Sequence, residues 1–305
     1  MKNEFFFPSS DGVTQIHAIE WIPEEVKGIV QIVHGMLEHI NRYHDFAEYL
    51  NSKGYYVVGH DHLGHGKSVA SPERKTFFNE KNGNACLIAD IHQLRVLTTE
   101  KYPDVPYYIL GHSMGSFLTR QYHGVHGEGL AGVILSGTGD QPYEKLHLGK
   151  ITCKVFATFK GWFYRSKFID NASAGSYSKK FERLNDGTSW ISKDVNVVKA
   201  YKEDPYRGPL FTLNAYYNMY EGILKMKKLE DAAAMPKDIP VFFVAGSEDP
   251  VGNNGKAVEK VYKQYLNCGV KNVQMKIYEG DRHEILNELD KDVVYEDIMN
   301  FLSLN

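Results

Sequence analysis

Short apolar runs alternate along this chain with stretches in which apolar residues recur at helical spacing. Strands that alternate with amphipathic helices are typical of a parallel sheet covered by helices on both faces. We therefore predict an α/β fold with a mostly parallel central sheet. The predicted strands span 28–35, 55–61, 107–110, 131–135, 241–245 and 273–280, and the predicted helices span 42–53, 85–101, 114–125, 254–267 and 291–303.

The two ends of this pattern are joined by a segment of different character. Near the start, β-rich runs at 4–8 and 14–22 flank a Ser-Ser-Asp-Gly turn, which predicts a hairpin. Residues 138–235 are helical or irregular and rich in aromatic side chains. We predict a core made of residues 1–137 and 236–305, with a helical cap inserted at 138–235.

One helix of the predicted cap has a continuous apolar stripe. We expect this stripe to pack against the helix's own domain, and the alternative is a face that touches a membrane or gates the substrate. The stripe consists of Leu148, Ile151, Val155, Phe159 and Trp162, and Lys150, Lys154 and Lys160 lie away from it.

Composition limits the partners and the compartment. The chain has 43% hydrophobic and 24% charged residues and a net charge of −3, so a globular protein is expected and nucleic acid is an unfavourable partner. The apolar run at the N-terminus is too short for a signal peptide, and three widely spaced cysteines fit reduced thiols. We expect a cytoplasmic protein, and the oligomeric state stays open.

Residues 57–68, VVGHDHLGHGKS, place three histidines and an aspartate close together, as a metal site does. His60, Asp61, His62 and His65 nearly match the spacing of binuclear metallohydrolases. Gly64 stands where the second metal needs a carboxylate, so a hydrogen-bonded loop is the favoured interpretation. We expect neither a metal nor another cofactor.

A candidate nucleophile lies between a predicted strand and a predicted helix. Residues 111–115 read Gly-His-Ser-Met-Gly, the G-x-S-x-G pattern in its strand-turn-helix context. Glycines at 111 and 115 permit the sharp turn that exposes Ser113. The backbone N–H of Met114 and the start of the helix then face a developing oxyanion.

A serine nucleophile needs a base and a group that orients the base, and in this pattern the acid precedes the histidine. Asp249 follows the strand at 241–245, with Glu248 as the alternative acid, and His283 follows the last predicted strand. A second oxyanion donor is expected from the loop after the strand at 28–35, where Met36 N–H is the candidate. His34 in that loop is a further candidate for the base, but a hydrogen bond that shapes the loop is the favoured role for this histidine.

Taken together, these motifs resemble the α/β-hydrolase superfamily and, within it, the monoacylglycerol lipase and lysophospholipase-like branch. The resemblance implies Ser113 as nucleophile, His283 as base and Asp249 as its orienting acid. It also implies Met36 and Met114 as oxyanion donors. The matching segments are HGMLEHINRY at 34–43, DHLGHGKS at 61–68, GHSMGS at 111–116, SEDPVG at 247–252 and GDRHEILNE at 280–288, with SWISKDVNVVKAYKEDPYRG at 189–208 in the cap.

Two positions depart from that family pattern. Leu37 stands where relatives often have glycine, and Ser116 replaces a common glycine after the nucleophile. The expected function is hydrolysis of a lipophilic carboxylic ester, such as a monoacylglycerol or lysophospholipid, through an acyl-enzyme. A peptidase or amidase on the same fold, and a binding protein without catalysis, are the alternatives.

Overall fold

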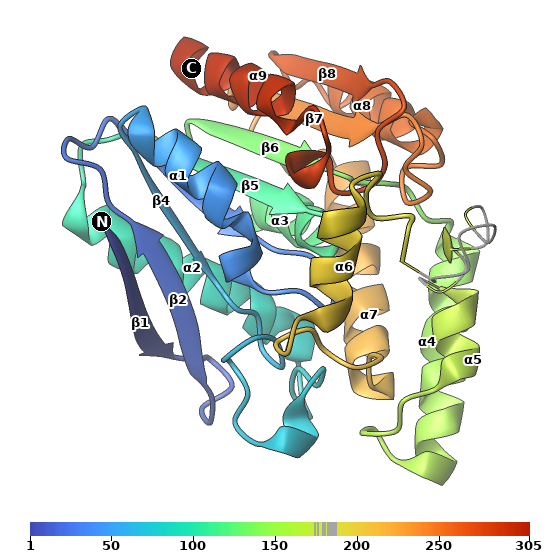
Figure 1. Ribbon diagram of the computed structural model, residues 1–305. Helices are drawn as coiled ribbons and strands as arrows, with labels where there is room; N and C mark the ends of the chain where they lie inside the picture. Colours follow the sequence, from blue (N-terminus) through green and yellow to red (C-terminus); the bar gives the residue numbers. More distant parts are fainter. Residues whose placement is uncertain (174, 176, 179–180, 182–187) are drawn as a thin grey trace.

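The computed structural model describes residues 1–173, 175, 177–178, 181 and 188–305. Within these residues eight strands form one sheet in the order β1-β2-β4-β3-β5-β6-β7-β8 (Figure 1). The pairs from β4 to β8 are all parallel, whereas β1 pairs with β2 and β2 with β4 in antiparallel fashion. The predicted α/β fold and N-terminal hairpin are confirmed. The strands are β1 (Lys2–Pro8), β2 (Gln15–Trp21), β3 (Gly28–Val33), β4 (Tyr55–His60), β5 (Tyr107–His112), β6 (Gly132–Ser136), β7 (Val241–Gly246) and β8 (Val273–Tyr278).

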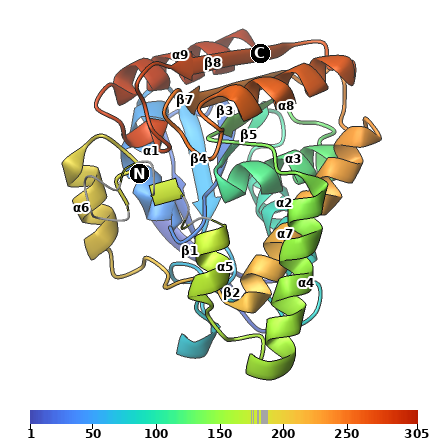
Figure 2. The same cartoon turned by 90° about the vertical axis from the view of Figure 1, so that its right-hand side faces the viewer.

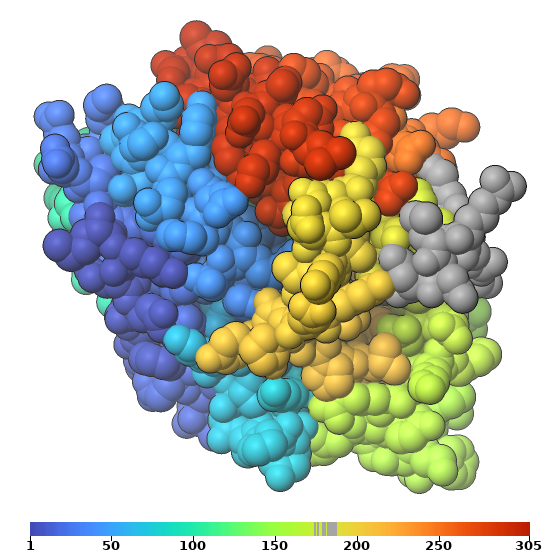
Figure 3. Space-filling model, in the orientation of Figure 1, coloured from blue at the N-terminus to red at the C-terminus, as the bar shows by residue number. Residues whose placement is uncertain are grey.

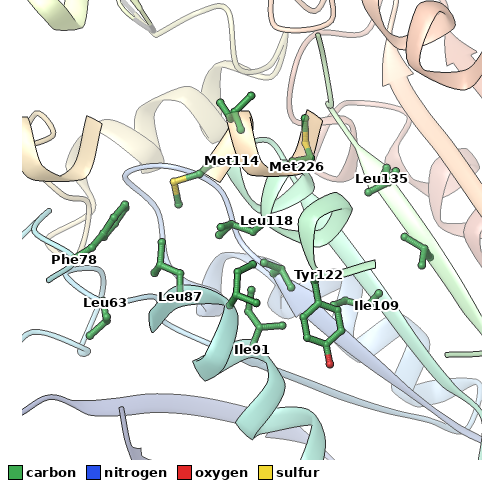
Figure 4. Packing of buried hydrophobic residues seen from close by; sticks show 14 of the residues in the cluster. Leu63, Phe78, Leu87, Ile91, Ile109, Met114, Leu118, Tyr122, Leu135 and Met226 are labelled. Carbon is green, nitrogen blue, oxygen red and sulfur yellow. The ribbon is translucent and has the colours of Figure 1, made fainter. Parts of the chain in front are cut away.

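Helices cover both faces of the sheet, as Figures 1 and 2 show together. On one face, Phe46 of α1 and Ile298 of α9 belong to the same buried apolar cluster. On the other face, residues of α2, α3 and α8 form a larger cluster, and Figure 4 shows Ile91, Leu118 and Tyr122 packed there. These helices are α1 (His44–Ser52), α2 (Gly83–Lys101), α3 (Met114–His126), α8 (Lys256–Asn267) and α9 (Lys291–Leu304).

The strand order places the chemistry. Strand β3 pairs with β4 on one side and with β5 on the other, so the chain order reverses beside β3. In parallel sheets such a reversal leaves a crevice at the carboxyl ends of the strands, where ligands bind. The segments that follow β3 and β5, which contain Met36 and Ser113, therefore meet at one edge of the sheet.

In the described residues between β6 and β7, the chain forms four α-helices. The longest, α7, has a buried face that packs on α3 and on α4. The division of the chain at residues 138 and 235 stays a prediction. The inserted helices are α4 (Tyr143–Lys160), α5 (Lys167–Ala172), α6 (Val195–Glu203) and α7 (Leu213–Asp231).

The favoured interpretation of the apolar stripe is wrong. Helix α4 packs on α7 through the side of α4 that carries Gly149. A Cβ on Gly149 would lie 2.7 Å from Cε2 of Tyr220 in α7. Leu146 and Cys153 on that side are buried. Close backbone approach at a glycine thus replaces bulky apolar packing, and most of the stripe points to solvent. Leu148, Ile151, Val155 and Phe159 are exposed, and Trp162 is half-buried against Tyr217.

None of the helices in the described residues combines the length and the apolar character needed to cross a bilayer.

Candidate active site

Ser113 occupies a strained turn between β5 and α3. Its backbone has φ 53° and ψ −121°, a conformation that costs about 1–3 kcal/mol and persists only when neighbouring structure enforces it. A Cβ on Gly115 would lie 1.9 Å from the Val33 carbonyl oxygen, and one on Gly111 would lie 2.5 Å from the Gly115 carbonyl oxygen. The prediction that both positions require glycine is confirmed. The Ser113 N–H donates to the Ser136 carbonyl at 3.0 Å, which fixes the turn to β6.

A cavity of about 170 Å³ opens at this turn, and four of the predicted site residues line it. These are Met36, Ser113, Met114 and His283. The loop after β3 lies directly against the serine, because a Cβ on Gly35 would come within 3.1 Å of Ser113 Cβ. Met114 is the first residue of α3, so its N–H belongs to the end of the helix that favours negative charge.

His283 and Asp249 form a buried pair. Nδ1 of His283 lies 2.9 Å from Oδ2 of Asp249, and both side chains are shielded from solvent. Asp249 is itself held by the Val251 N–H, which donates to its Oδ1 at 2.8 Å. The other ring nitrogen of His283, Nε2, is buried and has no hydrogen-bond partner among the described residues. The ring is thus oriented by a carboxylate and keeps one nitrogen free.

The alternative acid is directed elsewhere. Glu248 is half-exposed, and its Oε2 lies 3.8 Å from Nε of Arg282. Of the two adjacent carboxylates, Asp249 is the one that reaches His283.

The surroundings of His283 favour its charged form. Burial opposes a charged imidazolium, but the carboxylates of Asp249 and Glu284 outweigh this effect and raise the pKa of His283. The neighbouring His112 ring, 4.7 Å away between centroids, behaves oppositely. Burial, together with the nearby His283, lowers the pKa of His112 to about 4, so this ring stays neutral. Of these two rings, His283 is therefore the one that takes up a proton more readily.

The two departures from the family pattern have structural explanations. Leu37 has φ +61°, the left-handed region that costs a residue with a Cβ roughly 1–2 kcal/mol, which is why glycine suits this position. Its buried side chain approaches the insertion, since a Cβ on Gly208 would lie 3.1 Å from its Cδ2. The Ser116 hydroxyl donates to the Ser113 carbonyl at 2.6 Å and so adds a bond within the turn.

Hydrogen bonds organise the histidine-rich loop at residues 61–68, which follows strand β4 and its last residue, His60. Asp61 accepts from the N–H groups of Ile40 and Lys67 at 2.9 and 2.8 Å, and it contacts Nδ1 of His17 at 2.8 Å. His62 N–H donates to Nε2 of His34 at 2.9 Å. The loop interpretation is confirmed, and no group of three or more potential ligands in the described part of the chain is arranged to hold a metal.

The same contacts give His34 a structural position. Its Nδ1 lies 2.7 Å from the Gly35 carbonyl oxygen, and its Nε2 accepts from His62. Both ring nitrogens are occupied within the loop, so this histidine has none available to act as a base.

Comparison with known proteins identifies the family. The sequence profile of the family described as serine aminopeptidase, S33, matches residues 24–290. The chain belongs to this family. It is 25% identical over 308 residues to a monoacylglycerol lipase of Mycolicibacterium smegmatis, with 99% of this chain and 97% of the lipase covered. It is 26% identical over 276 residues to a monoglyceride lipase of Rattus norvegicus, with 88% and 80% covered.

Solved structures agree with this family assignment. A thermostable carboxyl esterase of Bacillus coagulans in complex with glycerol superposes with a TM-score of 0.92 at 30% identity, covering 99% of this chain and 98% of the esterase. A soluble variant of the monoglyceride lipase of Saccharomyces cerevisiae shares the fold, with a TM-score of 0.75 at 21% identity, covering 95% and 91%. The protein is an α/β-hydrolase of the lipase and esterase type, acting on carboxylic esters.

Several residues of the cavity were not found from the sequence. Glu38, Tyr201 and Glu284 line it, and Arg42 joins the two glutamates by hydrogen bonds. Glu38 lies within the matching segment 34–43 and Glu284 within the matching segment 280–288, yet nothing in the sequence shows that they share one arginine.

Proposed function

We propose that this hydrolase cleaves lipophilic carboxylic esters through an acyl-enzyme on Ser113. The observation that carries the proposal is the His283–Asp249 pair, whose free Nε2 belongs to a ring that lines the same cavity as Ser113. A serine hydroxyl is a weak nucleophile until an oriented base accepts its proton. His283 is in a position to supply that base.

The reaction proceeds in two halves. Ser113 Oγ attacks the ester carbonyl as its proton passes to His283, and the resulting oxyanion accepts hydrogen bonds from the N–H groups of Met36 and Met114. The imidazolium then donates its proton to the leaving alcohol, which departs and leaves the acyl group on Ser113. Water, deprotonated by His283, attacks this ester, and the imidazolium then returns its proton to Ser113 Oγ as the bond to the acyl group breaks and the carboxylic acid leaves. Asp249 stabilises the imidazolium in both halves.

The lining of the cavity favours a substrate with an apolar and a polar part. The apolar part of the lining includes Leu146 of α4 and Met219 and Ile223 of α7. The polar part includes Glu38, Tyr201 and Glu284. A fatty acyl chain fits the first environment and a hydroxylated alcohol the second. Together with the names of the relatives, this supports a monoacylglycerol as the substrate, and a lysophospholipid shares the same division into an acyl chain and a polar alcohol.

The nucleophile is tested by Ser113→Ala. We expect kcat for p-nitrophenyl butyrate and for a monoacylglycerol to fall by about a millionfold, because removal of a serine nucleophile costs on that order. A fluorophosphonate probe is expected to label the wild type and not the variant. Residual activity within about tenfold of wild type, or equal labelling, contradicts the assignment.

The family description leaves a peptidase or amidase as the second candidate. An aminoacyl arylamide and an ester of matched size, assayed on the same preparation, distinguish the two. The ester is expected to have the higher kcat/KM, and a preference for the amide contradicts the proposal.

We also infer that the α4 face, formed by Leu148, Ile151, Val155 and Phe159, contacts an anionic lipid surface. These four side chains are 65, 60, 51 and 81% exposed, and the yellow-green surface in Figure 3 belongs to the segment that contains α4 and α5. On the opposite side of the same helix, Leu146 lines the cavity. A helix that presents an apolar face beside basic residues lies stably at a membrane surface. Residues 143–168 contain one acidic residue, Glu144, and the basic residues Lys145, Lys150, Lys154, Lys160, Arg165 and Lys167, of which Lys150 is paired with Glu221 of α7.

The double variant Ile151→Ser/Phe159→Ser tests this contact by co-sedimentation with vesicles. Wild type is expected to bind phosphatidylglycerol-containing vesicles more tightly than pure phosphatidylcholine vesicles, and the variant to lose at least tenfold in affinity. The matched control is Leu289→Ser/Val293→Ser, which alters side chains that are 70 and 48% exposed on another surface. Equal binding by all three proteins contradicts the inference.

A further inference from the structure

Glu38, Arg42 and Glu284 form a buried ionic network beside the cavity. Nη1 of Arg42 donates to Oε2 of Glu38 at 2.9 Å and to Oε1 of Glu284 at 2.7 Å, and its Nη2 donates to Oε2 of Glu284 at 2.7 Å. The three side chains are 5, 10 and 7% exposed in chain order. Buried ion pairs contribute little net stability, whereas bidentate arginine contacts fix geometry well. The network is therefore better suited to positioning than to stabilising the fold.

One end of the network holds the loop after β3. Oε1 of Glu38 accepts from the Gly35 N–H and, at 2.8 Å, from the Tyr43 hydroxyl. Gly35 lies directly against Ser113, and Leu37 in the same loop has the unfavourable left-handed φ. A strained loop keeps its shape only while such contacts hold it. Glu38 thus fixes the loop that presents Met36.

The other end of the network holds the loop that contains His283. Glu284 is the next residue, and its N–H donates to the Ile191 carbonyl at 2.7 Å. Oε2 of Glu284 also accepts from Nδ2 of Asn287 at 3.1 Å. The carboxylate bound by Arg42 is therefore anchored one residue from the proposed base.

We propose that Arg42 is a positioning residue that sets the separation between the loop presenting Met36 and the loop presenting His283, through Glu38 and Glu284. This inference rests on the proposed function, since it assigns no reaction to Arg42 itself. The guanidinium also lies 4.8 Å from the ring centroid of Tyr201 on α6, so the insertion packs on the same network. Misplacement of reacting groups by about 1 Å costs roughly a hundredfold in rate.

The network also has an electrostatic signature at His283. Among the described residues, the carboxylates of Asp249, Glu38 and Glu284 act on that ring, and the neutral His112 lies beside it. Arg42 offsets the two glutamates. Loss of the arginine leaves their charges uncompensated and raises the pKa of His283, whereas loss of the Glu284 charge lowers it.

The test compares Arg42→Gln, Arg42→Lys and Glu284→Gln with wild type, using an ester substrate and pH profiles of kcat/KM. We expect R42Q to lose about a hundredfold in kcat with KM changed less than threefold. The acid limb of the profile is expected to move to higher pH in R42Q and to lower pH in E284Q. R42K keeps the charge and loses the bidentate geometry, so its limb is expected at the wild-type pH with kcat still reduced about tenfold.

Arg120 supplies a matched control. It also forms a buried bidentate pair, with its Nε and Nη2 at 2.7 and 2.8 Å from the carboxylate of Glu230. Arg120→Lys is expected to lower the urea midpoint about as much as R42K, with kcat within twofold of wild type and an unmoved acid limb. If R42Q does not fold, the inference is tested by the kcat of R42K and by the position of the acid limb of the kcat/KM profile in E284Q.

Three results overturn the inference. The first is a kcat of R42Q within threefold of wild type. The second is a loss of kcat in R120K as large as that in R42K. The third is a shift of the acid limb of the kcat/KM profile in the same direction in R42Q and E284Q. If wild type hydrolyses no ester, the proposed function fails and Arg42 has no site to position. If wild type hydrolyses the ester normally and the Arg42 variants keep wild-type kcat, this inference fails and the proposed function stands.

Discussion

At the scale of single residues, the proposed chemistry depends on which of two adjacent carboxylates meets the histidine. Strand β7 ends at Gly246, and the turn after it brings Asp249 onto Nδ1 of His283 while Glu248 points toward Arg282. Spacing along the chain does not distinguish these neighbours, since either lies in the loop that follows the strand. The turn geometry decides.

Asp249→Asn is therefore expected to lower kcat about ten-thousandfold, because an amide neither orients the imidazole in the correct tautomer nor stabilises its charged form. Glu248→Gln, the neighbouring control, is expected to stay within about twofold of wild type. Initial rates with p-nitrophenyl butyrate measure both. A loss in E248Q as large as that in D249N contradicts the assignment of Asp249.

At the scale of elements, α7 anchors the insertion to helices α2 and α3. Its N-cap, Thr212, is fully buried; its Oγ1 accepts from the Ala215 N–H at 3.2 Å and donates to the Thr76 carbonyl at 2.6 Å. One hydroxyl thus satisfies a free N–H of the first helical turn and joins the helix to the loop that precedes α2.

Thr212→Val keeps the side-chain volume and removes both hydrogen bonds. We expect the free energy of unfolding to fall by about 2 kcal/mol, because the buried Ala215 N–H loses its partner and the Thr76 carbonyl keeps only the Thr212 N–H, at 3.3 Å. Thr152→Val on α4, where the hydroxyl bonds only to the Leu148 carbonyl one turn earlier, is expected to change stability by less than about 0.5 kcal/mol. Urea unfolding followed by circular dichroism compares the two, and equal effects count against the capping role.

At the scale of the whole molecule, the interior holds several histidines that must stay neutral. His60 is fully buried, and neither of its ring nitrogens has a partner among the described residues. Burial lowers the pKa of His60 to about 4, partly opposed by Asp61. The unfolded chain therefore binds a proton at this residue at higher pH than the folded protein does. Its contribution to stability is unaffected above about pH 6.5 and falls as the pH drops from there toward 4.

His60→Leu is expected to reduce this acid sensitivity. The loss in unfolding free energy between pH 7 and pH 4 should be smaller than in wild type by on the order of 3 kcal/mol, the value of a pKa difference of this size. His147→Leu, which removes an exposed histidine, is the control and is expected to follow the wild-type pH dependence. If the unfolding free energy of H60L falls between pH 7 and pH 4 as much as that of wild type, the expectation is contradicted.

The sequence by itself predicted the order of strands and helices along the chain, and it named Ser113, His283 and, ahead of Glu248, Asp249 as the candidate central residues. The hairpin, the strand-turn-helix around Ser113 and the positions of Asp249 and His283 after core strands follow from local patterns. Such patterns reflect sterics and burial within a few neighbouring residues, so they can be recognised in the sequence without knowledge of the long-range contacts.

Only the tertiary structure decided which surfaces and charges meet. It exposed the α4 face by packing that helix through Gly149, and it chose Asp249 over Glu248. It also joined Arg42 to Glu284 across 242 positions of the chain. Contacts of this range depend on strand order and on loop paths, and these are set by the packing of the whole sheet rather than by any short stretch of sequence.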